Sequence, residues 1–123
     1  MSLMNAGEVL VGAALTAVAL RVGLSTADPG ETGASVAEPS DSGYSRQAVA
    51  WTDDGQVNGK QTYHNTAAVV FGPMAQGDYD VTHLFVAKTD TTILGSWTLT
   101  NARQIANGAT GTFAAGDLVI TVD

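Results

Sequence analysis

Short runs in which apolar and polar residues alternate recur along this chain, and they restrict the folds it can adopt. In Tyr79–Lys88, for example, Val81, Phe85 and Ala87 are at odd-numbered positions, so they would lie on one face of an extended chain and the residues at even-numbered positions on the other. A period of two is typical of a β-strand. Similar or weaker runs cover residues 18–25, 47–52, 61–71, 93–100, 103–106, 110–113 and 118–122.

Turn signals separate these runs, the strongest being Asp53-Asp54-Gly55, Asn58-Gly59 and Gly72-Pro73. Many short strands with at most one helix predict an all-β fold: an antiparallel β-sandwich or jelly-roll-like domain with a short N-terminal helix. A chain of 123 residues can bury one core, and no repeat or linker divides it. We therefore expect residues 18–123 to form a single β-sandwich domain with a long loop at residues 25–46.

Residues 1–17 are mostly apolar, and the sequence predicts a helix within them. Asn5 and Glu8 have the spacing of a capping box, which favours a helix over residues 6–15. Because this helix would be apolar nearly all round, it must be buried against the chain's own sheet or against a neighbouring subunit. We therefore interpret residues 1–17 as an apolar helical assembly segment.

The apolar stretch Val9–Leu20 does not predict a membrane anchor. It lacks a basic region before it and ends directly at Arg21. It is too short to span a bilayer and a poor candidate for a signal peptide. We expect no membrane partner, and we expect the chain to be made and assembled in a cytoplasm.

The stretch Leu24–Gln47 is rich in Gly, Ser, Pro, Asp and Glu and has little that could fill a core. Val36 and Tyr44 are its only sizeable apolar residues between Ala27 and Arg46. Fixing the backbone costs about 1–2 kcal/mol per residue, so contacts outside the segment must offset that cost. Either the domain's own sheet or neighbouring subunits could supply them, and the small number of apolar anchors favours neighbouring subunits.

The composition argues against several classes of function. A net charge of −7 disfavours a phosphate-binding groove, so we expect no nucleic-acid partner. We interpret the scattered acidic residues as a solubilising surface. The chain has no cysteine, so neither disulfides nor a thiolate metal site can support the fold.

Few residues could carry acid–base or metal chemistry. His64 and His83 are the neutral-pH candidates, but each lies in a predicted strand without a metal-ligand spacing partner. His83 is in line with Val81 and Phe85, which favours a core or interface role. Asp78 and Asp80 could offer two carboxylates to calcium, but no third ligand is in register, so we interpret them as solvated turn residues.

Neither nucleophile nor phosphate-binding motifs are present. The serines are not part of a Gly-x-Ser-x-Gly elbow, and no Gly-rich loop ends in Gly-Lys-Ser/Thr. Aromatic side chains could stack on a sugar ring, although Trp97 alternates with core-type residues. The aromatic candidates are Tyr44, Trp51, Tyr63, Tyr79 and Trp97. We expect no catalytic, cofactor-binding or metal site, no cofactor and no enzyme activity.

Five segments occur in one order: "LRVGLSTADPGETG", "GYSRQAVAW", "NTAAVVF", "VTHLFVA" and "FAAGDLVITVD". In this order the sequence resembles a family of small proteins from tailed bacteriophages and prophages, described as phage tail fibre or minor tail structural proteins. The resemblance covers residues 20–123. It implies a non-enzymatic structural protein of the virion, with other tail or capsid subunits as partners and with homo-oligomer formation. It brings no catalytic or ligand-binding residues.

Two other interpretations are open. One is a capsid decoration protein that clamps the head surface. The other is a carbohydrate-binding module for host attachment, which requires Tyr44, Trp51 or Tyr63 to be exposed on one face.

The apolar N-terminal segment gives the first testable prediction. Deleting residues 2–12 removes an apolar patch that a lone domain would expose, so the β domain should stay folded while incorporation into particles is lost. Circular dichroism of the purified variant and its abundance in particles measure the two outcomes. Incorporation at the wild-type level would contradict the assigned assembly role.

Overall fold

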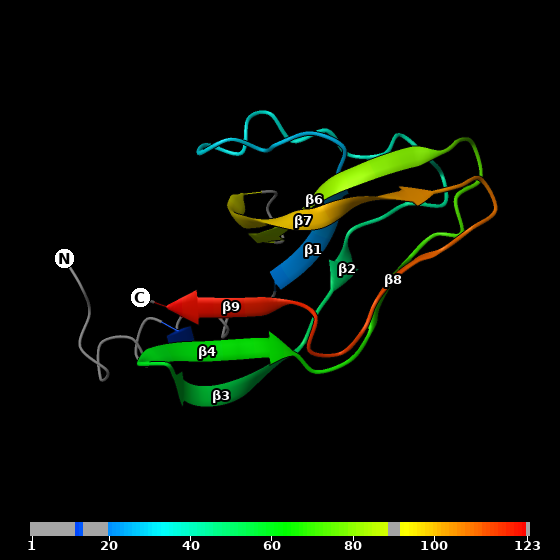
Figure 1. The fold of residues 1–123 in the computed structure, drawn as a ribbon. Helices are drawn as coiled ribbons and strands as arrows, with labels where there is room; N and C mark the ends of the chain where they lie inside the picture. Colours follow the sequence, from blue (N-terminus) through cyan, green and yellow to red (C-terminus); the bar gives the residue numbers. More distant parts are fainter. Residues whose placement is uncertain (1–11, 14–19, 89–91, 123) are drawn as a thin grey trace. The chain divides into compact units, whose positions relative to one another are not determined.

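The computed structural model describes residues 12–13, 20–88 and 92–122. Over residues 20–88 and 92–122 the described chain is all-β, and every strand pair with assigned partner residues is antiparallel (Figure 1). Of the helix expected over residues 6–15, Gly12 and Ala13 have helical backbone, and the rest lies outside the described residues. The described residues divide into two compact units, one with residues 49–69 and 113–122 and the other with residues 20–48 and 70–112.

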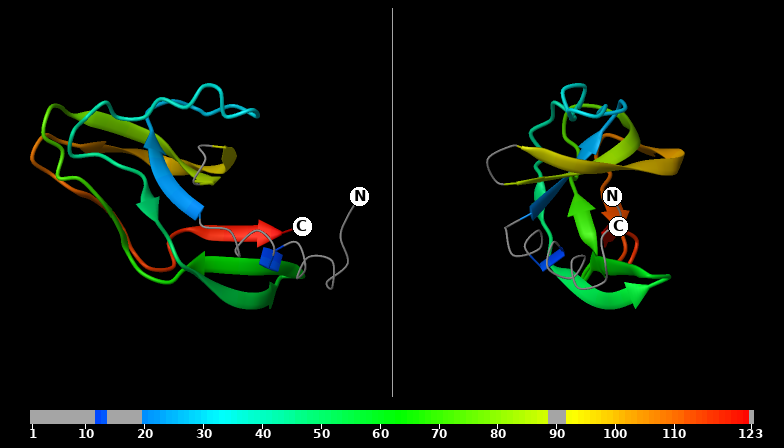
Figure 2. Two further views of the ribbon diagram at one scale, coloured as in Figure 1. Left: turned by 180° about the vertical axis from the view of Figure 1, so that it is seen from behind. Right: turned by 90° about the vertical axis from the view of Figure 1, so that its left-hand side faces the viewer.

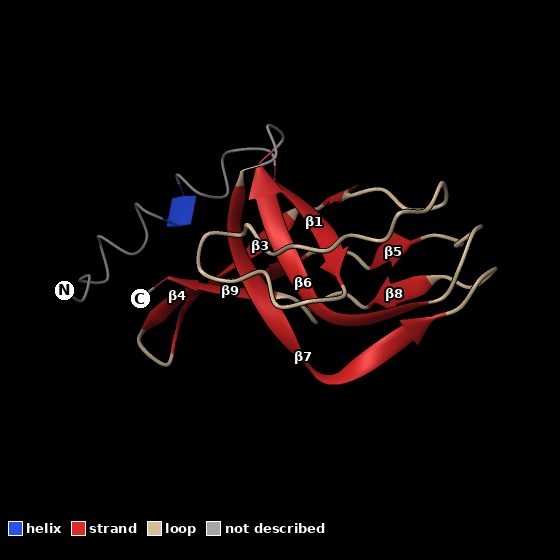
Figure 3. Cartoon of the chain, turned by 90° about the horizontal axis from the view of Figure 1, so that it is seen from above, coloured by secondary structure: helices blue, strands red, loops and turns tan. Residues whose placement is uncertain are grey.

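The larger unit contains a four-stranded sheet in the order β2-β1-β6-β7, and Figure 3 labels its strands β1, β6 and β7. Its strands are β1 (Leu20–Ser25), β2 (Gln47–Ala48), β6 (Tyr79–Lys88) and β7 (Ile93–Ile105). Apolar residues of β1 and β6 lie directly opposite each other, as in the pairs Val22↔Val86 and Leu24↔Leu84. All four of these side chains are buried, so this pair of strands forms the centre of the unit's core.

Strand β7 joins two runs that the sequence analysis treated as separate strands, 93–100 and 103–106. Its register against β6 shifts twice: Val86↔Gly95 is followed by Ala87↔Ile93, and His83↔Thr98 by Val81↔Arg103. Residues between Thr98 and Arg103 therefore bulge out of the ladder while the strand continues beyond them. A weak apolar pattern at residues 99–102 is thus a bulge and not the end of a strand.

The smaller unit contains a three-stranded sheet in the order β3-β4-β9, whose strands lie side by side in both views of Figure 2. Its strands are β3 (Trp51–Val57), β4 (Lys60–Asn65) and β9 (Val119–Val122). Asn58 and Gly59 form the tight turn between β3 and β4, and both have positive φ, 52° and 77°. This confirms the Asn-Gly turn, because such hairpin turns need left-handed backbone at both positions.

Two expectations about strand ends are wrong. Asp53-Asp54-Gly55 does not end a strand: the Asp53 carboxylate accepts the Gly55 N–H at 2.7 Å, and the register shifts there as a bulge within β3. The long strand expected over residues 61–71 is instead β4 followed by β5 (Val69–Phe71), which pairs with β8 (Gly111–Phe113) in a two-stranded sheet.

The break between β4 and β5 follows from the side chain of Asn65, which is fully buried. Its Oδ1 accepts the N–H groups of Gly116 and Leu118 at 3.0 and 2.9 Å. Its Nδ2 donates to the carbonyls of Ala67 and Ala114 at 2.9 and 3.0 Å. One amide thus satisfies four backbone groups of the two chain segments that leave β4 and enter β9.

Asn65 gives the second prediction. Asn65→Ala leaves four backbone groups without their side-chain partner, so the free energy of unfolding should fall by about 2–4 kcal/mol. Asn101→Ala, at an exposed position of β7, is the control and should change it by less than about 0.5 kcal/mol. Urea unfolding followed by circular dichroism measures both values. Equal stability of the two variants would show that the Asn65 side chain does not hold these segments together.

Candidate functional site

The most extensive polar network of the larger unit holds residues 26–46, here called the crossing, which join β1 to β2. Because β2 is only two residues long, it leaves the end of β1 uncovered, and the crossing bonds there instead. The Leu24 N–H donates to the Tyr44 hydroxyl at 3.1 Å, and the Thr26 N–H donates to the Ala37 carbonyl at 2.9 Å. The crossing therefore continues the hydrogen bonding of the sheet without being a regular strand.

Asp41 ties the crossing to the segment before β6. Its carboxylate accepts the N–H groups of Ala75, Gly43 and Gln76 at 2.8, 2.8 and 2.9 Å, and the Tyr79 hydroxyl at 3.0 Å. Desolvation raises the pKa of Asp41, but these four donors outweigh it and lower the pKa from 3.8 to about 2. Asp41 is therefore ionised under all ordinary conditions.

A second carboxylate fixes the other half of the crossing. Glu38 pairs with Arg46 at 2.6 Å and accepts the Tyr44 hydroxyl at 2.6 Å. Burial raises the pKa of Glu38, but the Arg46 guanidinium and the Tyr44 hydroxyl outweigh it, so the pKa is lowered overall. The Arg46 guanidinium carbon lies 4.9 Å from the centroid of the Phe85 ring, in cation–π contact. This side of the sheet is thus covered by the crossing.

These anchors revise the expectation that neighbouring subunits hold the crossing. The expectation rested on its few apolar residues, Val36 and Tyr44. Here the chain itself supplies contacts through two carboxylates, an arginine and the Ser25 hydroxyl, which accepts the Ala37 N–H at 3.1 Å. Counting apolar anchors overlooked the backbone N–H groups that short acidic side chains can bind.

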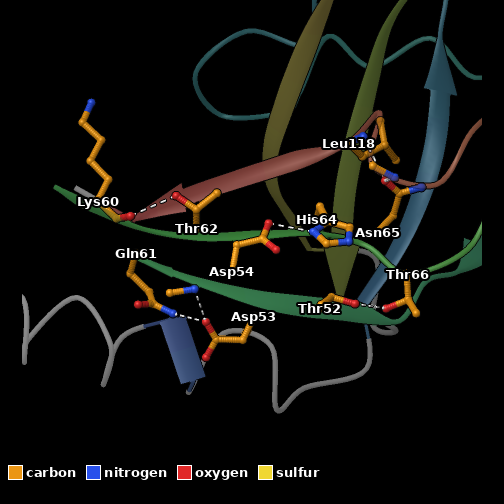
Figure 4. A network of polar contacts seen from close by, with 12 residues as sticks. Thr52, Asp53, Asp54, Lys60, Gln61, Thr62, His64, Asn65, Thr66 and Leu118 are labelled. Atoms are coloured by element: carbon orange, nitrogen blue, oxygen red, sulfur yellow. Dashed lines mark hydrogen bonds and ion pairs between the residues drawn. The ribbon is translucent and has the colours of Figure 1, made fainter. Parts of the chain in front are cut away.

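In the smaller unit, the side chains of His64 and Asp54 form a hydrogen bond on the β3–β4 hairpin, with Nδ1 and Oδ2 2.6 Å apart (Figure 4). Asp54 is the extra residue of the bulge in β3, between the pairs Asp53↔Tyr63 and Gly55↔Thr62. The neighbouring hydroxyls of Thr52 and Thr66 bond to each other at 2.7 Å. Sequence reasoning missed the His64–Asp54 contact, because it depends on the register of the β3–β4 hairpin.

The remaining candidates do not come together in one place. His83 is half-buried and bonds to the Thr82 hydroxyl through Nδ1 at 2.8 Å. Asp78 accepts the Asn107 N–H at 2.7 Å, and Asp80 is exposed. Within the described ranges, no group of three or more His, Cys, Asp or Glu side chains could hold a metal ion.

None of the aromatic side chains is exposed. Tyr63 is 4% exposed, and Trp51, Tyr79 and Trp97 are half-buried. Tyr44 is half-buried too and stacks on Phe71, with ring centroids 6.1 Å apart. Tyr44, Trp51 and Tyr63, which the carbohydrate-binding interpretation requires to be exposed on one face, are thus half-buried or buried.

The polar groups of both units are used to hold chain segments together. The carboxylates of Glu38, Asp41 and Asp53 accept bonds from the protein itself. No helix among the described residues is long and apolar enough to cross a membrane.

A family of phage proteins matches nearly the whole chain. The model of the family described as podophage GP4 fiber I protein gp80 matches residues 4–121. The chain belongs to this family. The resemblance to phage tail fibre proteins is thereby confirmed. No curated protein matches the chain. The residues that match the fiber I protein gp80 family include every described strand except for the last residue of β9, Val122.

Asp41 gives the third prediction. In this member of the fiber I gp80 family, the pKa of the Asp41 carboxyl is lower in the folded chain than its ordinary value of 3.8. The ionised carboxylate therefore stabilises the fold above pH 3.8, and this stability is lost as the pH falls toward about 2. Asp41→Asn cannot accept four donors, so its stability at neutral pH should be lower and should depend less on pH between about 4 and 2. Hydrogen exchange at residues 41–44 and 75–76 should also be faster.

Asp80→Asn is the matched control for this measurement. It removes the same charge at an exposed position whose side chain makes no hydrogen bond within the described part of the chain. Urea unfolding between pH 7 and pH 2 compares the two variants with the wild type. If the free energy of unfolding changed with pH in the same way for Asp41→Asn and Asp80→Asn, the carboxylate of Asp41 would not anchor the crossing.

Proposed function

We propose that this protein is a non-enzymatic structural subunit of a podophage tail fibre, associated in the virion with other tail proteins and with copies of itself. The observation that carries the proposal is the match of the fiber I gp80 family model to residues 4–121. The structure supports it with polar groups that are used for internal anchoring and with no cluster of metal-ligating side chains among the described residues.

Several finer features belong to the same proposal. A sandwich packing of the antiparallel sheets and the assembly role of residues 1–17 are predictions that the fibre role would explain. A jelly-roll strand order stays a prediction as well. Assembly in the host cytoplasm before incorporation into the virion completes this hypothesis.

Location in the particle gives the fourth prediction. If the protein is a fibre subunit, it should fractionate with tails when particles are separated into heads and tails, in dozens of copies or fewer per particle. Quantitative mass spectrometry of both fractions, with the major capsid protein as the head marker, measures this. Recovery with heads in hundreds of copies would contradict the proposal and indicate the capsid decoration alternative.

A further inference from the structure

The two faces of the three-stranded sheet β3-β4-β9 differ in exposure. One face, here called the Tyr63 face, carries Gln61, Tyr63 and Asn65 of β4, which are 1%, 4% and 0% exposed. Val122 of β9, which lies opposite Gln61 on the same face, is 8% exposed. Val119 of β9, on the opposite face, is 42% exposed. The Tyr63 face is therefore covered along β4 and at the end of β9, where the opposite face is open.

Gly12 lies against this face. Gly12 and Ala13 are the described residues of the N-terminal segment, residues 1–17, and they belong to the same compact unit as the sheet. Gly12 is buried, whereas Ala13 is exposed. A Cβ added to Gly12 would lie 2.6 Å from Cε2 and 2.9 Å from Cζ of Tyr63, so a side chain at position 12 fits only if the buried ring moves. The absence of a side chain thus lets the backbone rest directly on the ring.

Polar groups of the Tyr63 face are paired within the chain. Gln61 Nε2 donates to Asp53 Oδ1 at 2.6 Å, and the Asn65 amide binds backbone groups. In Figure 4 the side chains of Asp53 and Gln61 point to the side of the sheet on which the blue ribbon of residues 12–13 lies. Burying a polar group is costly chiefly when it has no hydrogen-bond partner. An apolar segment can therefore cover this face without leaving these groups unsatisfied.

The N-terminal segment has the composition that such a cover needs. Glu8 is the only charged side chain before Arg21, and most of the other residues are apolar. The sequence required burial of this segment and left open whether the chain's own sheet or a neighbouring subunit provides it. Gly12 contacts Tyr63 of its own chain. This contact favours the chain's own sheet.

We propose that the Tyr63 face is the docking surface for the chain's own N-terminal segment, and that Gly12 is the contact at which the segment is fixed. A free subunit then exposes neither the face nor the apolar segment, which limits unspecific association before assembly. Deleting residues 2–12 would uncover the Tyr63 face, instead of removing an exposed apolar patch as the sequence alone indicated. The docking does not depend on the fibre role, which the fractionation of heads and tails tests separately.

Nuclear Overhauser effects test the contact directly in the full-length chain. We mix equal amounts of ¹³C-labelled and unlabelled protein and record isotope-filtered spectra, which separate contacts within one chain from contacts between two copies. Effects between the Gly12 Hα protons and the Tyr63 ring protons are expected within the labelled chain. Effects that join only a labelled to an unlabelled chain would show that a second copy occupies the face, and they would overturn the proposal. The absence of both would overturn it as well.

A pair of substitutions tests whether the contact holds the segment in place. Gly12→Val puts a side chain against the ring, so hydrogen exchange of the β4 amides at residues 61–64 should become faster by about tenfold or more. Ala13→Val is the matched control at the neighbouring exposed position and should change these rates by less than about twofold. Equal effects of the two variants would show that position 12 is not fixed on the Tyr63 face.

A double-mutant cycle identifies the partner of Gly12. Tyr63→Leu removes the ring atoms that approach Gly12, so Gly12→Ala should accelerate hydrogen exchange by a smaller factor in the Tyr63→Leu chain than in the wild type. Circular dichroism verifies that the variants are folded. If Gly12→Ala had the same effect in both backgrounds, Gly12 would not rest on Tyr63, and the proposed docking surface would be wrong.

Discussion

The carboxylate of Asp41 is the contact on which the arrangement of the larger unit depends. It binds three backbone N–H groups and the Tyr79 hydroxyl, and it thereby joins the crossing to the segment before β6. A crossing of Gly, Ser and Pro has little apolar surface to bury, so only hydrogen bonds and ion pairs can offset its conformational entropy. An ionised acceptor does this well, because charge-assisted hydrogen bonds are about twice as strong as neutral ones. Glu38 and Arg46 repeat the arrangement at the other end.

Much of the strand pattern could be predicted from the sequence. Period-two alternation located β6 at Tyr79–Lys88 with both ends correct, and the Asn58-Gly59 turn was placed correctly between its strands. Both signals are local. The face of a strand on which a side chain lies, and the positive φ of a tight turn, are set by residues that are neighbours in the sequence. The all-β fold with antiparallel sheets followed from these signals.

What could not be predicted depended on contacts between residues far apart in sequence. The break after β4 comes from Asn65, whose amide binds backbone groups about 50 residues away. The anchoring of the crossing depends on Asp41 meeting residues 75–79, and a count of apolar side chains could not reveal that. The His64–Asp54 contact joins residues of two different strands, so it depends on the register of the β3–β4 hairpin.

The acidic residues of this chain do more than give it a negative net charge, because most of those described also hold parts of the backbone in place. Scattered carboxylates were interpreted as a solubilising surface, yet most of those described accept hydrogen bonds from the chain's own backbone or side chains. Asp28, Asp53 and Asp117, for example, each bind an N–H within three residues of themselves and fix a turn or bulge. A hydrogen bond does not remove the charge of a carboxylate, so the side chains that give the chain its net charge of −7 also fix its turns and bulges.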